Sequence, residues 1–179
     1  MEYLKPYFNG ICILIFAFTI LFIDYFGWFT PKNSLKKGIQ YFEDNNYVKA
    51  IEYLSQATRS NTNDITARFY LGAAYHQYGW HDDALKHYHI TIELAQNAVR
   101  SLHSSARIYR LQNHIEQATI YYRKALAINP TAADIWFELG TVLNETGNKL
   151  QAQNAFDKAL QLDPKNEFLI NSIHSIQKQ

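Results

Sequence analysis

A pattern with a period of about 34 residues constrains this chain more than any other feature of its sequence. At two places in the pattern the residue is always small, and a third place holds Leu, Tyr or Phe. The small sets are Gly38, Gly72, Ala106 and Gly140, and Ala50, Ala84, Ala118 and Ala152. The large set is Leu54, Tyr88, Tyr122 and Phe156. Small residues let two helices approach closely, and the large residues fill the space between neighbouring helix pairs.

Each repeat has the pattern of two helices joined by a tight turn. In the last repeat, Trp136, Leu139 and Leu143 have the spacing i, i+3 and i+7, which places them on one helical face. The turn that follows contains Gly147, which can adopt the positive φ of a helix C-cap. The second helix ends at Asp163-Pro164. Successive steps of one period back from Gly147 reach Asn113, Gly79 and Asn45.

This arrangement of Trp, Leu-Gly, Leu, Ala, Phe, Ala and Pro resembles the tetratricopeptide repeat (TPR). The early repeats depart from the motif, because Thr62 and Gln96 replace the proline. The resemblance implies an all-α fold, a right-handed α-solenoid of four TPR helix hairpins whose concave face is lined by the first helix of each repeat. The expected repeats are 31–64, 65–98, 99–132 and 133–166, and residues 167–179 are expected to form a capping helix.

Residues 1–30 differ sharply from the repeats. The run Ile11–Ile23 is almost wholly apolar, and a helix over residues 7–29 would be about 34 Å long, enough to span a bilayer. Aromatic residues at both ends resemble interfacial belts. We therefore predict a single-pass transmembrane anchor. The alternatives are a cleaved signal peptide, although no A-x-A-like site follows the run, and a buried helix.

The side of the membrane on which the solenoid would lie is left open by the sequence. Lys5 stands on the N-terminal side against Lys32, Lys36 and Lys37 on the other, and the positive-inside rule then favours a cytoplasmic solenoid. A first apolar helix after a very short tail is also typical of a signal-anchor, which would place the solenoid outside the cytoplasm.

Composition and motifs indicate neither nucleic-acid binding nor catalysis. The chain has 17 Lys and Arg against 16 Asp and Glu, so its net charge creates no positive electrostatic potential that would favour binding of nucleic acid. Cys12 is the single cysteine. The sequence contains no Gly-rich phosphate loop, G-x-S-x-G, H-E-x-x-H or paired-cysteine metal motif. We expect no cofactor, no metal and no small-molecule substrate, and interpret the seven histidines as surface or partly packed residues.

Groove-facing residues of a TPR first helix recur at about i, i+3, i+7 and i+10. In the third repeat the resemblance therefore implies a basic stripe, and the neighbouring repeats contribute aromatic and polar side chains beside it. The stripe is Arg100, His103, Arg107 and Arg110, flanked by Phe69 and His76 on one side and by Phe137 and Asn144 on the other. Such a stripe could hold a peptide with an acidic residue or a free carboxylate. Alternatively, the arginines form a solvated face paired with Glu116, Asp134 or Glu138.

The first repeat departs from TPR domains that bind chaperone tails. Those domains place Lys and Asn where this chain has Leu35 and Ile39. With Phe42, these residues form an apolar contact face, expected to pack on the anchor, on the bilayer surface or on a partner helix. Burial against the following repeat is the alternative for Phe42.

We accordingly predict a membrane-anchored protein–protein interaction scaffold whose concave groove binds a partner segment, in the assembly of a membrane or secretion complex. A permanent accessory subunit of a multi-subunit membrane complex is a second hypothesis. A metal-binding protein or an enzyme that uses the histidines is a third. The resemblance is specific for the fold and does not identify the partner.

Overall fold

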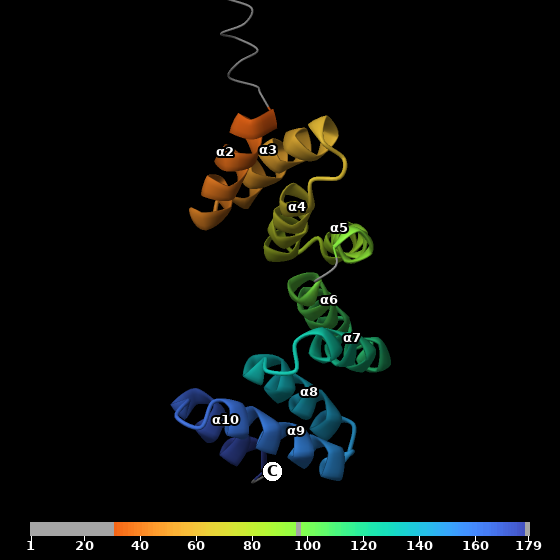
Figure 1. The fold of residues 1–179 in the computed structure, drawn as a ribbon, viewed down its shortest axis with the longest axis vertical. Coiled ribbons are helices and arrows are strands. Elements are labelled where there is room, and N and C mark those ends of the chain that lie inside the picture. The colour runs from red at the N-terminus through yellow and green to blue at the C-terminus, as the bar shows by residue number, and fades with distance from the viewer. Residues whose placement is uncertain (1–30, 96–97, 178–179) are drawn as a thin grey trace, which may run out of the picture.

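The structure is a computed structural model, and it describes residues 31–95 and 98–177. These residues form helices and no strands. The helices are α2 Pro31–Glu43, α3 Tyr47–Ser60, α4 Ile65–Tyr78, α5 His81–Leu94, α6 Val99–Leu111, α7 Ile115–Ile128, α8 Ala133–Glu145, α9 Lys149–Leu162 and α10 Glu167–Gln177. Figure 1 shows the pairs stacked along one long axis, from α2 and α3 at one end to α8, α9 and α10 at the other. The predicted all-helical TPR solenoid is confirmed.

The same turn joins the two helices of every pair. The residues at the corresponding place, Asn45, Gly79, Asn113 and Gly147, have φ values of 58°, 93°, 61° and 77°. In the last pair the backbone N–H of Asn148 donates to the carbonyl of Leu143 at 2.9 Å, and the N–H of Gly147 donates to that of Asn144 at 3.0 Å. These bonds satisfy carbonyls that the end of α8 leaves unpaired. The left-handed C-cap predicted at Gly147 is therefore present in all four pairs.

Close packing within the pairs explains the small residues. A Cβ atom added at Gly140 would lie 2.6 Å from ring carbons of Phe156, and one added at Gly72 would lie 3.0 Å from the ring of Tyr88. The third pair places Ala106 and Tyr122 at the same positions, and both are fully buried. The large side chain of each second helix thus packs directly on the backbone of its first helix.

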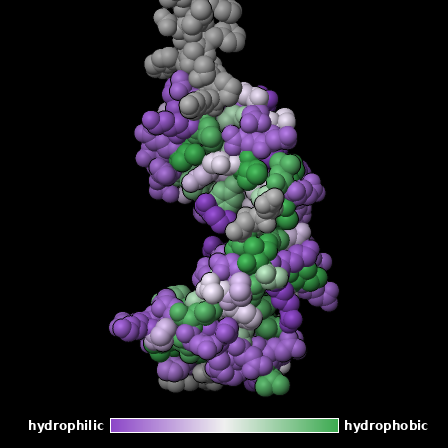
Figure 2. All heavy atoms as spheres, in the orientation of Figure 1, coloured by the Kyte–Doolittle hydropathy of each residue, from purple (hydrophilic) through white to green (hydrophobic). Residues whose placement is uncertain are grey.

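The solenoid is closed at its C-terminal end by α10. Ile173 of this helix is buried in the core cluster of the last two pairs, and Leu169 is buried beside it. Figure 2 shows that one side of the molecule is hollowed between the end formed by α2 and α3 and the end formed by α10. The first helices α4 and α6 lie nearer to this hollow than their partners α5 and α7 (Figure 1). We call this side the inner face.

The predicted anchor over residues 7–29 lies outside the described residues. Within residues 31–95 and 98–177, no helix combines the length and the apolar character that a membrane crossing requires. This finding corrects the predicted localisation as a single-pass membrane protein, and membrane association forms no part of the function proposed below.

Candidate functional site

The basic stripe predicted on α6 contacts the first helices of the neighbouring pairs, α4 and α8, and its four residues have different surroundings. Arg100 meets aromatic rings of α4. His103, Arg107 and Arg110 instead meet carboxylates of α8, the first helix of the next pair. The stripe is therefore divided into an aromatic end and a paired end.

Arg100 is an exposed cation held over aromatic rings. Its guanidinium carbon lies 4.1 Å from the ring centroid of Phe69 and 6.0 Å from that of Tyr70. Phe69 meets Tyr70 edge-on, with ring centroids 5.7 Å apart. None of the ion pairs formed within residues 31–95 and 98–177 involves Arg100. Its guanidinium is thus positioned by cation–π contact, and no carboxylate of the described residues neutralises it.

A small cavity opens beside this guanidinium. It has a volume of about 160 Å³ and is bounded by Phe69, Tyr70, Thr91, Ala98 and Arg100. The lining is aromatic and aliphatic except for a few hydroxyls and the cation itself. A side chain next to a bound carboxylate would have an apolar recess within reach.

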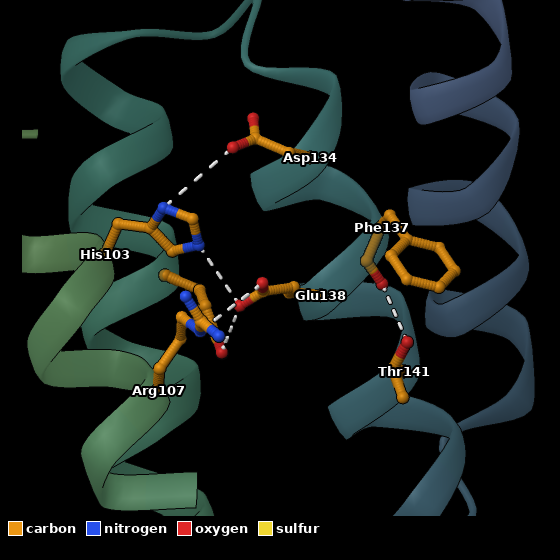
Figure 3. Close-up of polar contacts among 7 residues, drawn as sticks. His103, Arg107, Asp134, Phe137, Glu138 and Thr141 are labelled. Atoms are coloured by element: carbon orange, nitrogen blue, oxygen red, sulfur yellow. Dashed lines mark hydrogen bonds and ion pairs between the residues drawn. The ribbon is translucent and has the colours of Figure 1, made fainter. Parts of the chain in front are cut away.

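Glu138 of α8 contacts the two middle residues of the stripe, His103 and Arg107. Its Oε2 lies 3.1 Å from Nε2 of His103, and its Oε1 lies 3.7 Å from Nε of Arg107. Oε2 also accepts a 2.7 Å hydrogen bond from the hydroxyl of Tyr122. His103 Nδ1 lies 3.9 Å from Asp134 Oδ2, and Figure 3 shows His103 between the two carboxylates. One carboxylate of α8 thereby contacts α6 and α7.

The ionisation of Glu138 follows from these contacts. Burial raises the pKa of its carboxyl, but hydrogen bonds from His103 and Tyr122 and the charge of Arg107 outweigh burial and hold that pKa below its usual value. Burial and the neighbouring carboxylate raise the pKa of Tyr122 far above that of free tyrosine. At neutral pH, a negative Glu138 therefore faces a protonated, donating Tyr122.

Arg110 is paired at the end of α6. Its Nε donates to Oε2 of Glu145 at 3.3 Å, and its Nη2 donates to Oε1 of the same carboxylate. This two-point geometry raises the pKa of Arg110. A cavity of about 470 Å³ lies between Arg107, Arg110, Tyr122 and Glu138. The paired end of the stripe is thus close to neutral. Of the acceptors that the alternative named, Glu138 lies beside Arg107, whereas Arg110 pairs with Glu145 instead.

The residues predicted to flank the stripe are placed differently from one another. His76 packs against His81 with ring centroids 5.5 Å apart, and burial, His81 and Arg107 lower its pKa to about 4. Phe137 packs on Phe156 and on Phe168 of α10, each at 6.0 Å. Figure 3 shows Phe137 and Thr141 on the side of α8 away from His103 and Arg107.

Of the two predicted phenylalanines, Phe69 therefore adjoins the basic stripe, whereas Phe137 packs toward the end of the solenoid. Asn144 lies half-buried near the end of α8.

The predicted apolar face of the first repeat is half-buried within the molecule. Leu35, Ile39 and Phe42 pack against the core cluster of the first two pairs. Phe42 meets Tyr70 of α4 edge-on at 5.6 Å. This is the arrangement given by the alternative, burial against the following repeat.

Two contributors to the site were not expected from the sequence. Glu145 pairs with Arg110, and the hydroxyl of Tyr122 fixes Glu138. The i, i+7 spacing of Glu138 and Glu145 is a signal that both lie on one face of α8. In the part of the chain that the structure describes, no three His, Cys, Asp or Glu side chains are grouped as metal ligands would be.

The proteins similar to this chain include the following two solved structures and one sequence relative. The crystal structure of MamA protein superposes with a TM-score of 0.75 at 18% identity, covering 85% of this chain and 82% of that one. The crystal structure of the APC/C hetero-tetramer Cut9-Hcn1 gives a TM-score of 0.74 at 15% identity, covering 83% of this chain and 30% of that one. Protein O-mannosyl-transferase TMTC3 of Mus musculus is 26% identical over an alignment of 140 residues, and the match covers 69% of this chain. The chain spans 15% of the length of that relative.

Family models match nearly all of the solenoid. The model described as TPR repeat matches residues 106–147, and two described as tetratricopeptide repeat match residues 133–166 and 35–101. Together they extend from residue 35 to residue 166 apart from residues 102–105. With the regular helix pairs and the recurring left-handed turns, these matches show that the chain belongs to the tetratricopeptide repeat family.

Proposed function

We propose that this chain is a protein–protein interaction scaffold whose inner face binds a segment of a partner protein through a carboxylate. The observation that carries the proposal is Arg100, which is held 4.1 Å above Phe69 and forms no ion pair with the described residues. A guanidinium stacked on a ring keeps its N–H edges available, and two of them can bind one carboxylate. The carboxylate belongs to an acidic side chain or to a C-terminus.

Arg107 supports the same ligand chemistry. Its side chain is 57% exposed, and its 3.7 Å separation from Glu138 is longer than a hydrogen bond. Because Glu138 is already held by His103 and Tyr122, Arg107 can turn toward a ligand without leaving a buried carboxylate unpaired. A segment along the inner face would thus meet Arg100 first and Arg107 two helical turns later.

The proposed setting is the assembly of a multi-protein complex. The likeness to the Cut9-Hcn1 structure supports it at the level of the fold, since that structure is a hetero-tetramer of protein subunits. Mannosyl transfer, named for the mouse relative, is not proposed for this chain. We propose binding rather than catalysis.

A permanent accessory subunit of a multi-subunit complex is the second candidate. Its specific support is the exposure of large apolar side chains, since Leu111 is 68% exposed, Phe168 69% and Leu150 78%. Obligate interfaces are more apolar than transient ones. A permanent subunit would remain with its complex in high salt, whereas a carboxylate-dependent contact would be weakened by screening.

The test is a quantitative crosslinked pull-down with the Arg100→Glu/Arg107→Glu variant. The matched control is Arg59→Glu/Lys165→Glu, which changes the net charge equally at exposed residues of α3 and of the loop before α10. We expect at least one partner to be retained by wild type and control and lost by the inner-face variant. Purified partner should then bind the variant at least about tenfold more weakly, because an attraction is replaced by a repulsion. Equal retention of every partner by all three proteins would show that the inner face does not bind a carboxylate.

A further inference from the structure

Aromatic side chains fill the same place between the first and the second helix in the first three helix pairs. Each time a tyrosine of the first helix contacts an aromatic residue at the same place in the second helix. The two rings are stacked in the first and second pairs and tilted by 50° in the third. The pairs are Tyr41 with Tyr53 at 5.4 Å, Tyr75 with His87 at 5.5 Å, and Tyr109 with Tyr121 at 5.1 Å. Each partner lies one repeat period from its counterpart in the next pair. This aromatic contact, which we call the stack, is therefore a repeated element of this solenoid.

The fourth pair lacks the stack. Leu143 and Ala155 occupy the two places. The space there, which residues of α7, α8 and α9 line, is open. The resulting groove has a volume of about 570 Å³, and its apolar lining includes Trp136, Leu139 and Leu143. That volume lies within the range of about 300–1,000 Å³ found for ligand pockets. We call it the outer groove, since it shares no lining residue with the inner-face site.

The preceding pair shows what such a junction holds when it is filled. There the hydroxyls of Tyr109 and Tyr121 lie 3.3 Å and 3.1 Å from Nε2 of His89 on α5. The residue one period after His89 is Arg123, which lines the outer groove. In the outer groove, a permanent cation thus stands where the ring hydroxyls of the preceding pair find their polar partner.

The charge at the groove is positive, and no carboxylate among the described residues pairs with it. Arg123 Nη2 donates to Gln151 Oε1 at 3.0 Å, and Lys158 Nζ donates to Gln161 Oε1 at 2.9 Å. Within residues 31–95 and 98–177, neither side chain lies within ion-pair distance of a carboxylate. An apolar groove with two such cations is complementary to an aromatic ring that carries a negative charge beside it.

We propose that the outer groove binds an aromatic side chain of a partner protein, with an adjacent carboxylate of the same segment at Arg123 and Lys158. The ring takes the place that Tyr109 and Tyr121 fill in the preceding pair, against Leu143 and Ala155. The carboxylate forms charge-assisted hydrogen bonds in place of the glutamine contacts. This gives the solenoid a second binding surface, on a side that the inner-face proposal does not use.

The test uses the full chain and three acetylated, amidated pentapeptides as probes. They are Gly-Tyr-Glu-Glu-Gly, the ring-deleted Gly-Ala-Glu-Glu-Gly and the uncharged Gly-Tyr-Gln-Gln-Gly. Fluorescence anisotropy of labelled probes gives the Kd, and the NMR signal of the Trp136 indole reports whether the groove is occupied. We expect the tyrosine–glutamate peptide to bind at least about tenfold more tightly than either of the others, because each lacks one of the two contacts.

Two variants locate the binding. Leu143→Tyr/Ala155→Tyr rebuilds the stack of the preceding pair, and we expect it to fill the groove and abolish the Trp136 response. Arg123→Gln/Lys158→Gln changes only the rim, and we expect about tenfold weaker binding of the tyrosine–glutamate peptide with unchanged binding of the glutamine peptide. The substitutions of this second variant lie at the rim and leave the core unchanged. It therefore still tests binding in the outer groove if the first variant fails to fold.

A charge-matched control variant leaves both candidate surfaces intact. Arg59→Gln/Lys165→Gln removes two positive charges at exposed residues that line neither the outer groove nor the inner-face cavities, so it should bind all three peptides as wild type does. The proposal is overturned if the ring-deleted peptide binds as well as the tyrosine peptide, if the rim variant binds all three as wild type does, or if the Trp136 signal does not respond to the tyrosine–glutamate peptide. The Trp136 response and the rim variant distinguish this proposal from the inner-face one, because Trp136, Arg123 and Lys158 line the outer groove alone.

Discussion

Oε2 of Glu138 on α8 lies 3.1 Å from Nε2 of His103 on α6, and this contact joins two successive helix pairs through a partly buried carboxylate. The same oxygen accepts a hydrogen bond from Tyr122 on α7, so three helices depend on it. Glu138 therefore shapes the inner face, whereas the residues proposed to bind the ligand there are cations. It also provides the most direct test of how the basic stripe is held.

Replacing Glu138 with Gln should destabilise the fold at neutral pH by about 1–2 kcal/mol, because hydrogen bonds to a charged acceptor become bonds to a neutral one. The folded-state pKa of Glu138 lies below its unfolded value of 4.5. Its contribution is therefore complete above pH 4.5 and is lost as the pH falls through the folded pKa. Urea unfolding at pH 7 and pH 3 should show wild type and variant converging at the lower pH. A constant difference at both values would contradict this account, and Glu116→Gln, on the exposed side of α7, is the control.

His76→Gln should flatten the dependence of stability on pH between 6.5 and 4. Burial, His81 and Arg107 lower the folded-state pKa of His76 from 6.5 to about 4, so the unfolded chain binds a proton at a pH where the folded chain does not. Wild-type stability is thus complete above pH 6.5 and declines as the pH falls toward 4. After discounting for partial exposure, the decline from pH 7 to pH 5 should be about 1 kcal/mol larger in wild type than in the variant. Denaturant titration at both pH values measures it. His174→Gln, at an exposed site on α10, should follow wild type, and the same behaviour of His76→Gln would refute the assignment.

Gly140→Ala should lower the free energy of unfolding by about 1–2 kcal/mol. The new methyl group would lie 2.6 Å from ring carbons of Phe156, and the cost of overpacking exceeds the gain of about 1 kcal/mol from replacing a helical glycine. Gly72→Ala meets the Tyr88 ring at 3.0 Å, so it should be closer to neutral. Thermal unfolding of both variants gives the ranking. The reverse order would show that the ring of Phe156 moves away more easily than its packing indicates.

Ala118→Leu should separate folding from binding. Ala118 is 0% exposed at the crossing of α6 and α7, and the added side chain should cost about 1–3 kcal/mol of stability. At temperatures where the variant remains folded, affinity for an inner-face ligand should stay within about twofold of wild type, because the groove side chains are untouched. Arg100→Glu should do the opposite, since exposed charges contribute little to folding. Calorimetry and binding measurements on the same two proteins test this pair of outcomes.

The fold could be predicted from the sequence because its determinants are local and repeated. Asn113 and Gly147 are different residues, yet both adopt the left-handed turn that their shared place in the pattern predicts. Ala118 and its counterparts are small because two helices cross there, which depends on one helix pair alone.

The site could be predicted only in part because it depends on the angle between successive pairs. The spacing of Arg100, His103, Arg107 and Arg110 predicts that they share one face of α6, because that depends on this helix alone. That Glu145 reaches Arg110, while Phe137 turns toward α10, depends on how α8 packs against α6 and on where the last helix lies. The outer groove was missed for a related reason. Leu143 and Ala155 are ordinary core residues in sequence, and only the filled junction of Tyr109 and Tyr121 shows what they leave open.

The four left-handed turns also determine which changes in length this architecture can absorb. One residue inserted inside a helix would rotate everything after it by about 100°, moving the small residues away from the crossing and the stripe away from the inner face. Adding or removing one whole repeat would instead restore every turn to an equivalent place. We therefore expect homologous chains to vary in length by whole repeats, or within the loops that join one pair to the next.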